Sequence, residues 1–140
     1  MLRVCRVFLI VVSFLNGLAG LVCGLLLVIG PDGRLMQMGM LLPVIQRFPL
    51  ADVFFRDFLW IGVAMLLVLG LPNLVAAAML VRRSGWQYLA TLIAGVLLLL
   101  WCGFELIYMF NVPAVGYFVV GVLSVLASAL LLKPAIEASA

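Results

Sequence analysis

Residues 58–104 read FLWIGVAMLLVLGLPNLVAAAMLV-RRSG-WQYLATLIAGVLLLLWCGF, and they set the architecture of the whole chain. Two uncharged apolar runs, residues 58–81 and 86–104, flank a short basic link. The hydrocarbon core of a bilayer is about 30 Å thick, and roughly 20 apolar helical residues cross it. Because backbone groups find no water in lipid, a single segment must cross as a helix. The sequence therefore predicts a helical hairpin embedded in a membrane.

The composition places the rest of the chain in the same class. Of its 140 residues, 69% are hydrophobic and only 9% are charged, whereas a soluble domain carries about 25% charged residues. The mean hydropathy is +1.43. The net charge is only +3, and most basic residues flank apolar runs, a pattern that orients helices in a lipid bilayer and does not bind nucleic acid. We expect a polytopic membrane protein.

The sequence contains no histidine, and this absence excludes several kinds of catalytic and metal site. A Ser-His dyad or triad, an HExxH zinc helix, histidine-ligated haem and a histidine proton relay all require that side chain. Glu105 is the one acidic residue inside an apolar run, so one chain cannot supply a membrane-embedded carboxylate pair. Cys5, Cys23 and Cys102 form no CxxC pair, so no disulfide framework is expected. The sequence favours a protein without enzymatic activity or cofactor.

Two further apolar runs complete a single membrane domain, predicted as an all-α polytopic protein with an antiparallel four-helix transmembrane bundle. The first run is too long for a secretory signal and is followed by no small-x-small cleavage site, so we expect it to remain as a helix. The expected helices cover residues 7–30, 57–81, 86–110 and 115–132, and a long connection covers residues 31–56.

Local features predict how these helices pack and begin. Gly17, Gly20 and Gly24 share one face of the first helix, and small residues let helix backbones approach closely in lipid. We favour packing within the chain over dimerisation for this face. Pro72 lacks a backbone N–H and is expected to kink the second helix. Asp57 is placed to cap the start of that helix.

The connection, residues 31–56, is unusually apolar for a loop and is broken by Pro43 and Pro49. Because it is too short and interrupted to span a bilayer, we expect one or two short helices that lie at the interface or fold over the mouth of the bundle. The charges in and next to the connection balance, with Arg34, Arg47 and Arg56 against Asp32, Asp52 and Asp57.

Met36, Met38 and Met40 form an M-x-M-x-M string in the connection. Thioethers are soft ligands that suit Cu(I), and such a string is one way to hold that ion. Methionine is also an ordinary packing residue at apolar surfaces, and no histidine or cysteine lies nearby. We interpret the string as packing and keep Cu(I) binding as the alternative.

Basic residues in short flanks predict the orientation. If both termini are cytoplasmic, that side of the membrane holds an unbalanced basic set: Arg3, Arg6, Arg82, Arg83 and Lys133. The opposite side then holds the acid-balanced connection. The positive-inside rule favours this arrangement. It predicts a protein of the plasma (bacterial inner) membrane with both termini in the cytoplasm and an extracytoplasmic connection.

Three polar residues are expected at one depth inside the bundle. At about 1.5 Å of rise per residue, Asn16, Asn73 and Ser124 each lie about 12 to 14 Å from the cytoplasmic helix ends. Polar side chains at one depth can form hydrogen bonds between helices, each worth about 0.6 to 2 kcal/mol. We favour that structural role over the alternative, in which the layer is the floor of a cavity opened by the Pro72 kink.

Glu105 is the most unusual of the polar positions. It lies about 9 Å below the outer helix end, and Trp101 and Tyr108 share its helix face. A carboxylate in lipid is costly, so it should pair with a cation, face protein or a wet cavity, or be protonated. We favour an ion pair with Arg56 or another arginine of the connection. The alternatives are a polar contact in an aromatic-lined pocket and a proton or cation site.

A series of motifs runs through most of the chain in a fixed order: Pro31-Asp32-Gly33, a Met/Leu-rich connection, Phe55-Arg56-Asp57-Phe58, Leu71-Pro72-Asn73-Leu74-Val75-Ala76-Ala77, Leu99-Leu100-Trp101 through Glu105, and a Tyr/Phe-Gly fourth helix. This series resembles a widespread group of small bacterial four-helix membrane proteins that are loosely DoxX-like in plan. Some DoxX-type proteins are linked to quinone-dependent sulfur oxidation or to redox accessory complexes. No residue here matches a catalytic motif of those proteins, so the resemblance assigns no functional residue.

Two functions fit these residues. The leading hypothesis is a small, non-enzymatic binding or accessory protein that holds a lipophilic molecule, such as a lipid or quinone, or a partner helix near Glu105 and Trp101 in the outer leaflet. The alternative is a small-solute or ion transporter or channel that uses Glu105 and the Asn16/Asn73 layer. Because four helices line a pore poorly, that alternative requires a homo-oligomer. A redox enzyme would need a bound cofactor and is the least favoured hypothesis.

Overall fold

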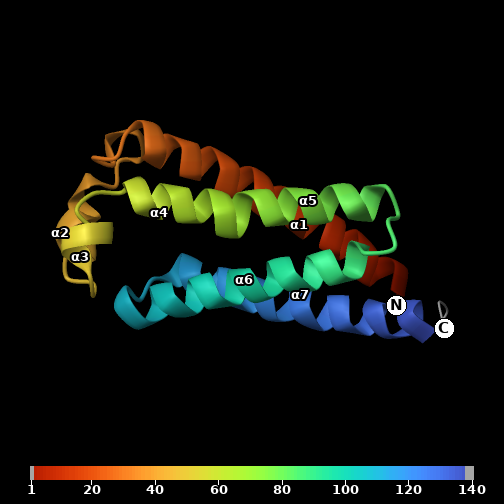
Figure 1. The fold of residues 1–140 in the computed structure, drawn as a ribbon. Coiled ribbons are helices and arrows are strands. Elements are labelled where there is room, and N and C mark those ends of the chain that lie inside the picture. The colour runs from red at the N-terminus through yellow and green to blue at the C-terminus, as the bar shows by residue number, and fades with distance from the viewer. Residues whose placement is uncertain (1, 138–140) are drawn as a thin grey trace.

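The computed structural model describes residues 2–137, which form helices and turns without any strand (Figure 1). Four of the helices are long and apolar enough to cross a membrane, and they cover Leu2–Ile29, Leu59–Val81, Gln87–Tyr108 and Val112–Pro134. The expected all-α polytopic bundle is therefore confirmed. The chain is held mainly by apolar contacts between these four rods, as their composition requires.

The elements in chain order are α1 (Leu2–Ile29), η1 (Arg34–Met36), η2 (Gly39–Leu41), α2 (Leu42–Ile45), α3 (Ala51–Phe54), α4 (Leu59–Ala64), η3 (Met65–Gly70), α5 (Leu71–Val81), α6 (Gln87–Tyr108) and α7 (Val112–Glu137). One layer contains α1 packed along the continuous rod α4–η3–α5, and the other contains α6 packed along α7 (Figure 1). The layers meet mainly where α5 contacts α6 and where α1 contacts α7. The start of α1, the α5–α6 turn and the end of α7 lie at one end of the bundle (Figure 1).

Most helix ends lie within three residues of the expected bounds, including the start of α7 at Val112 in place of residue 115, and two differ by five residues. Helix α1 already begins at Leu2, before the apolar run, and Arg6 inside it donates from Nη2 to the carbonyl oxygen of Leu80 at 2.6 Å. Carbonyls in the last turn of a helix lack partners within the helix. At the end of α5 the Leu80 carbonyl accepts from the N–H of Arg83 at 3.3 Å, and Arg6 adds a second donor from α1. Helix α7 continues through Pro134 to Glu137, beyond the expected end at residue 132.

Backbone-to-backbone contact joins α1 to the α4–η3–α5 rod. A Cβ atom placed on Gly20 would lie 2.6 Å from the backbone nitrogen of Gly70, and one placed on Gly24 would lie 2.9 Å from the carbonyl oxygen of Gly62. Gly17 faces Leu74 in the same way: a Cβ atom placed on Gly17 would lie 2.8 Å from the backbone nitrogen of Leu74. The glycine face of α1 thus packs within the chain, the arrangement that the sequence favoured.

The irregularity in the second membrane helix lies before Pro72 and takes the form of a π-helical turn. In η3 the backbone hydrogen bonds reach back five residues, whereas those of an α-helix reach back four. The N–H of Leu71, for example, bonds to the carbonyl oxygen of Leu66. Such turns occur as single insertions inside α-helices and are frequent at functional sites. Asp57 is placed as expected at the start of α4, where its Oδ1 accepts from the N–H of Leu59 at 2.9 Å.

Replacing Gly20 with alanine should force α1 away from η3, because the new Cβ would meet the Gly70 backbone. Overpacking of this kind costs about 1–3 kcal/mol, so the variant should unfold at lower temperature or lower SDS fraction in mild detergent. Gly103→Ala is the matched control, since a Cβ there would meet no atom within 4 Å. Equal stability of the two variants would contradict a backbone-contact interface.

Candidate functional site

The connection, residues 31–56, forms a cap over the end of the bundle opposite the termini (Figure 1). Gly33 anchors it in a left-handed turn with φ of +75°, a conformation that glycine adopts without a Cβ clash. The Phe58 ring lies directly over this glycine, and the Phe58 N–H donates to the carbonyl oxygen of Pro31 at 2.8 Å. These contacts tie the end of α1 to the start of α4.

Aromatic packing holds the underside of the cap against α6. Phe48 is buried, and its ring lies 5.2 Å from that of Phe55, 5.7 Å from that of Phe104 and 5.1 Å from that of Tyr108. Edge-on and tilted pairs at these separations are favourable for aromatic rings. Ile45 is buried in the same cluster. The apolar composition of the connection thus reflects a folded cap over the bundle mouth.

A cavity of about 750 Å³ lies beneath the cap, between α4–η3 and α6. We call it the wedge cavity. Its lining is almost entirely apolar and comes from the cap, from the α4–η3 rod and from α6; the residues used below are Met36, Phe54, Trp60, Ala64, Trp101 and Glu105. It exists because α6 packs against η3 and α5 but makes hardly any contact with α4.

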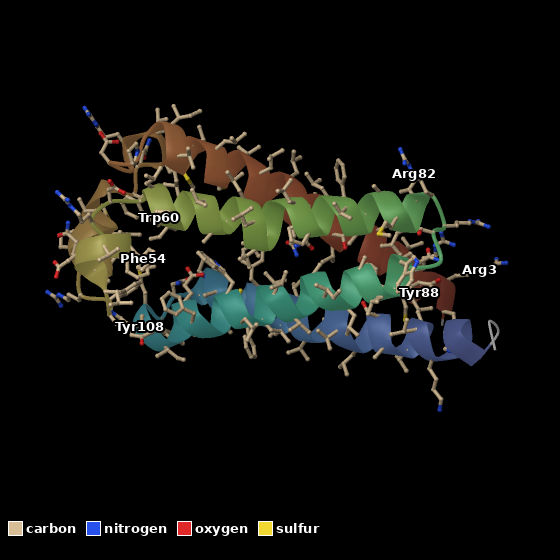
Figure 2. The ribbon with its side chains drawn as sticks, viewed as in Figure 1. Arg3, Phe54, Trp60, Arg82, Tyr88 and Tyr108 are labelled. Atoms are coloured by element: carbon tan, nitrogen blue, oxygen red, sulfur yellow. The ribbon has the colours of Figure 1, made fainter. Side chains whose placement is uncertain are left out.

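The wedge cavity is open on one side of the bundle, toward the region that lipid would occupy. Trp60 and Leu100 line it from opposite walls, yet their exposed fractions are 47% and 66%. Phe54 of the cap, which also lines the cavity and is exposed, packs edge-on against Trp60 with ring centroids 5.7 Å apart (Figure 2). The cap therefore roofs the cavity while its flank between α4 and α6 remains open.

A second cavity of about 210 Å³ lies between α1, η3, α6 and α7. We call it the core cavity; its principal lining residues are Asn16, Met65, Trp101, Cys102, Glu105 and Tyr117. Met65, Trp101 and Glu105 line both cavities, so the two spaces adjoin at these side chains. The core cavity carries polar side chains that the wedge cavity lacks.

Glu105 has a partner that the sequence did not predict. Its Oε1 accepts from Nδ2 of Asn111 at 3.1 Å. Asn111 also caps α7, because its Oδ1 accepts from the N–H of Ala114 at 2.7 Å. The amide therefore connects the start of α7 to the carboxylate of α6. An asparagine followed by Val-Pro at a helix start is a recognisable capping signal, and it could have identified Asn111.

The expected ion pair between Glu105 and an arginine of the connection is not formed. Among residues 2–137 the one ion pair joins Arg34 to Asp32, two residues apart on the surface of the cap. The backbone N–H and guanidinium of Arg34 hold the pKa of Asp32 below its usual range. Arg56 is exposed to the surroundings, as is Arg47. The cap directs its charges outward, where hydration is retained, and only its apolar side faces the cavity.

The three residues of the predicted Trp101–Glu105–Tyr108 stripe do not lie in one site. Trp101 lies beside Glu105 at the junction of the two cavities. Tyr108 is 43% exposed and packs against Phe104 at 4.9 Å between ring centroids, so it supports the cap and does not line either cavity (Figure 2). Sharing a helix face was not enough to place the three residues in one site.

The polar layer is buried, but its hydrogen bonds differ from the expected ones. Nδ2 of Asn73 donates to the carbonyl oxygen of Leu69 at 2.9 Å, and Oγ of Ser124 donates to that of Val120 at 2.8 Å. Both bonds stay within one helix, because such side chains easily reach the carbonyl one turn earlier. Only Asn16 lines a cavity, and its Nδ2 has no hydrogen-bond partner.

A polar contact between helices does form elsewhere. Oγ of Ser128 on α7 donates to Oγ1 of Thr91 on α6 at 2.9 Å, and both residues are buried. The sequence analysis missed this pair, although Ser124 and Ser128 stand one turn apart on a helix that is otherwise apolar. Their spacing could have indicated a helix-facing polar stripe, but its partner depends on the packing of α6.

The methionine string does not gather at one point. Met36 and Met38 line the wedge cavity and pack on the buried cluster beneath the cap. Met40 is 81% exposed and lies outside that cavity. This arrangement fits the packing interpretation of the first two residues. In the part of the chain that the structure describes, no three His, Cys, Asp or Glu side chains are grouped to hold a metal ion.

Comparisons with protein-family models, curated proteins and solved structures gave no match for this chain. The candidate site consists of an apolar, side-open wedge cavity, a smaller and more polar core cavity, and Glu105 at their junction.

Glu105 and Asn111 should be energetically coupled, whereas Glu105 and Arg56 should not. A double-mutant cycle with Glu105→Ala and Asn111→Ala measures the interaction free energy between the two side chains. The cost of losing the Asn111 cap of α7 occurs in both the single and the double variant, so it cancels. We expect a coupling free energy above about 0.5 kcal/mol from unfolding in mild detergent, as for residues in contact. The same cycle with Arg56→Ala is expected near zero. Strong coupling to Arg56 would restore the ion pair and contradict the hydrogen bond.

Proposed function

We propose that this protein is a non-enzymatic membrane protein that holds one lipophilic molecule in the wedge cavity. The observation that carries the proposal is the size and lining of that space. Ligand sites occupy about 300–1,000 Å³ and combine mostly apolar walls with a few polar groups. At about 750 Å³, with Glu105 among otherwise apolar residues, the wedge cavity has this character.

The open flank supports entry from the bilayer. A lipophilic molecule that entered through water would first have to expose its hydrocarbon surface, at about 25 cal/mol for each Å². Passage between α4 and α6 avoids that cost, since Trp60 and Leu100 face the lipid region while lining the cavity. The roof formed by the cap favours a small molecule over a partner transmembrane helix, because a crossing helix must continue through the full bilayer depth.

The charges at the two ends support a position in the outer leaflet of the plasma membrane. Arg3 and Arg82 lie at the end opposite Phe54 and Trp60 (Figure 2). The basic end is thus separate from the cap, whose Arg34 is paired with Asp32. With the basic end in the cytoplasm, as the positive-inside rule favours, the cap and the wedge cavity are extracytoplasmic.

A transporter is the second candidate, because Glu105 and Asn16 both line the core cavity and Glu105 also lines the adjoining wedge cavity. Two observations weigh against it. Asn73, which belonged to the suggested path, bonds within its own helix and lines neither cavity. Beyond this depth, Leu9 and Leu80 are buried in an apolar cluster. Transport would require that cluster to open, and flux into proteoliposomes that is unchanged by Glu105→Gln would rule out the suggested path.

Filling the wedge cavity should remove its occupant. Ala64 lines the cavity, so Ala64→Phe is expected to abolish lipid-mass adducts in native mass spectrometry from mild detergent. Ala78→Phe adds the same ring at an exposed position on the same membrane-spanning rod and should retain the adducts. Wild-type protein without any adduct, or equal occupancy in both variants, would contradict the proposal.

A further inference from the structure

The two cavities together have the form of a site for an amphiphile. The wedge cavity offers apolar walls, and the core cavity behind it offers a carboxamide, a carboxylate and a phenol. Trp101 and Glu105 line both spaces, so a molecule that fills the wedge with its hydrocarbon part has a polar group within reach of the core cavity.

Asn16 supplies an unused donor. The residue is only 8% exposed, and its Nδ2 is buried without a partner. A buried polar group without a hydrogen bond is destabilising, because it has lost its bonds to water and gained none in the protein. Asn73 and Ser124, at the corresponding depth, avoid that cost by bonding within their helices. Asn16 does not, and it lines the core cavity. A hydrogen-bond acceptor in that cavity would satisfy it.

Glu105 supplies an acceptor. Its hydrogen bond from Asn111 uses Oε1, and a carboxyl group has capacity for further bonds. No Lys or Arg lines either cavity. A phosphate or carboxylate head would therefore meet a carboxylate without a compensating cation, which is costly in a medium of low dielectric constant. A hydroxyl group both donates and accepts, so it matches Glu105 and Asn16 together.

We propose that the core cavity binds the hydroxyl head of a long-chain lipid alcohol whose hydrocarbon part fills the wedge cavity. In this arrangement Asn16 donates to the hydroxyl oxygen, and the hydroxyl donates to Glu105. The proposal rests on the proposed function, since it requires an occupied wedge cavity, and it adds the chemical class of the occupant and the residues that recognise its head.

The fluorescence of Trp101 provides the test, because this side chain lies at the junction of the cavities. In a Trp60→Phe/Trp86→Phe background it is the remaining tryptophan. The probes are a long-chain alcohol and the matched alkane, both brominated at the same mid-chain carbon, added to protein in phosphatidylcholine nanodiscs. One or two hydrogen bonds correspond to about tenfold in affinity, so the alcohol should quench at about tenfold lower concentration than the alkane.

Substitutions at the head site should remove this preference without removing binding. With Asn16→Leu or Glu105→Leu, the alcohol is expected to quench no better than the alkane, while quenching by the alkane persists and reports an intact fold. Asn73→Leu is the matched control, since this buried asparagine lines neither cavity and should leave the preference unchanged.

The possible failures are distinguishable. If the alcohol and the alkane quench equally in protein that retains Asn16 and Glu105, the alcohol inference is overturned and the proposed function still stands. A matched brominated amine that binds more tightly than the alcohol would also overturn it, because Glu105 would then act as a cation site. If neither probe quenches Trp101 more than it quenches an exposed tryptophan in the same nanodisc, the proposed function itself is overturned.

Discussion

Backbone contact between α1 and the α4–η3–α5 rod fixes the geometry of this bundle. Gly20 and Gly24 meet Gly70 and Gly62 so closely that a single methyl group would not fit between them. In lipid, where apolar side chains gain little by leaving the solvent, such close packing is the main source of helix association. It draws one layer together tightly, and α6 meets the α4–η3–α5 rod through η3 and α5 with hardly any contact to α4. The wedge cavity is the space that this unequal packing leaves beside α4.

The cap closes one end of that space. Its turn depends on Gly33, and its aromatic underside reaches across the cavity to α6 through Phe48. Because the cap places its charged side chains outward, the cavity receives almost no polar group from above. The polar character comes from within the bundle, through Glu105 and Asn16. The roof of the wedge cavity thus comes from the cap, its walls come from α4–η3 and α6, and the polar groups come from Glu105 and Asn16.

The sequence predicted the features that depend on local composition. Membrane-length apolar runs, the folded connection, the capping role of Asp57 and the glycine face of α1 all follow from properties of neighbouring residues. The sequence did not predict which side chains contact one another across helices. Glu105 bonds to Asn111 because α7 begins beside it, and Tyr108 turns to the cap because Phe48 lies there. Such pairings depend on how helices dock, which depth and helix periodicity alone do not determine.

An experimental density map of the protein in a lipid nanodisc would examine the wedge cavity itself. If the wedge cavity holds a lipophilic molecule, elongated density that belongs to no side chain should run between α4 and α6 beneath the cap and reach toward Glu105. If instead α4 and α6 lie in direct contact, with Trp60 and Leu100 closing over a filled interior, there is no binding space and the interpretation of this protein as a lipid-binding bundle is wrong.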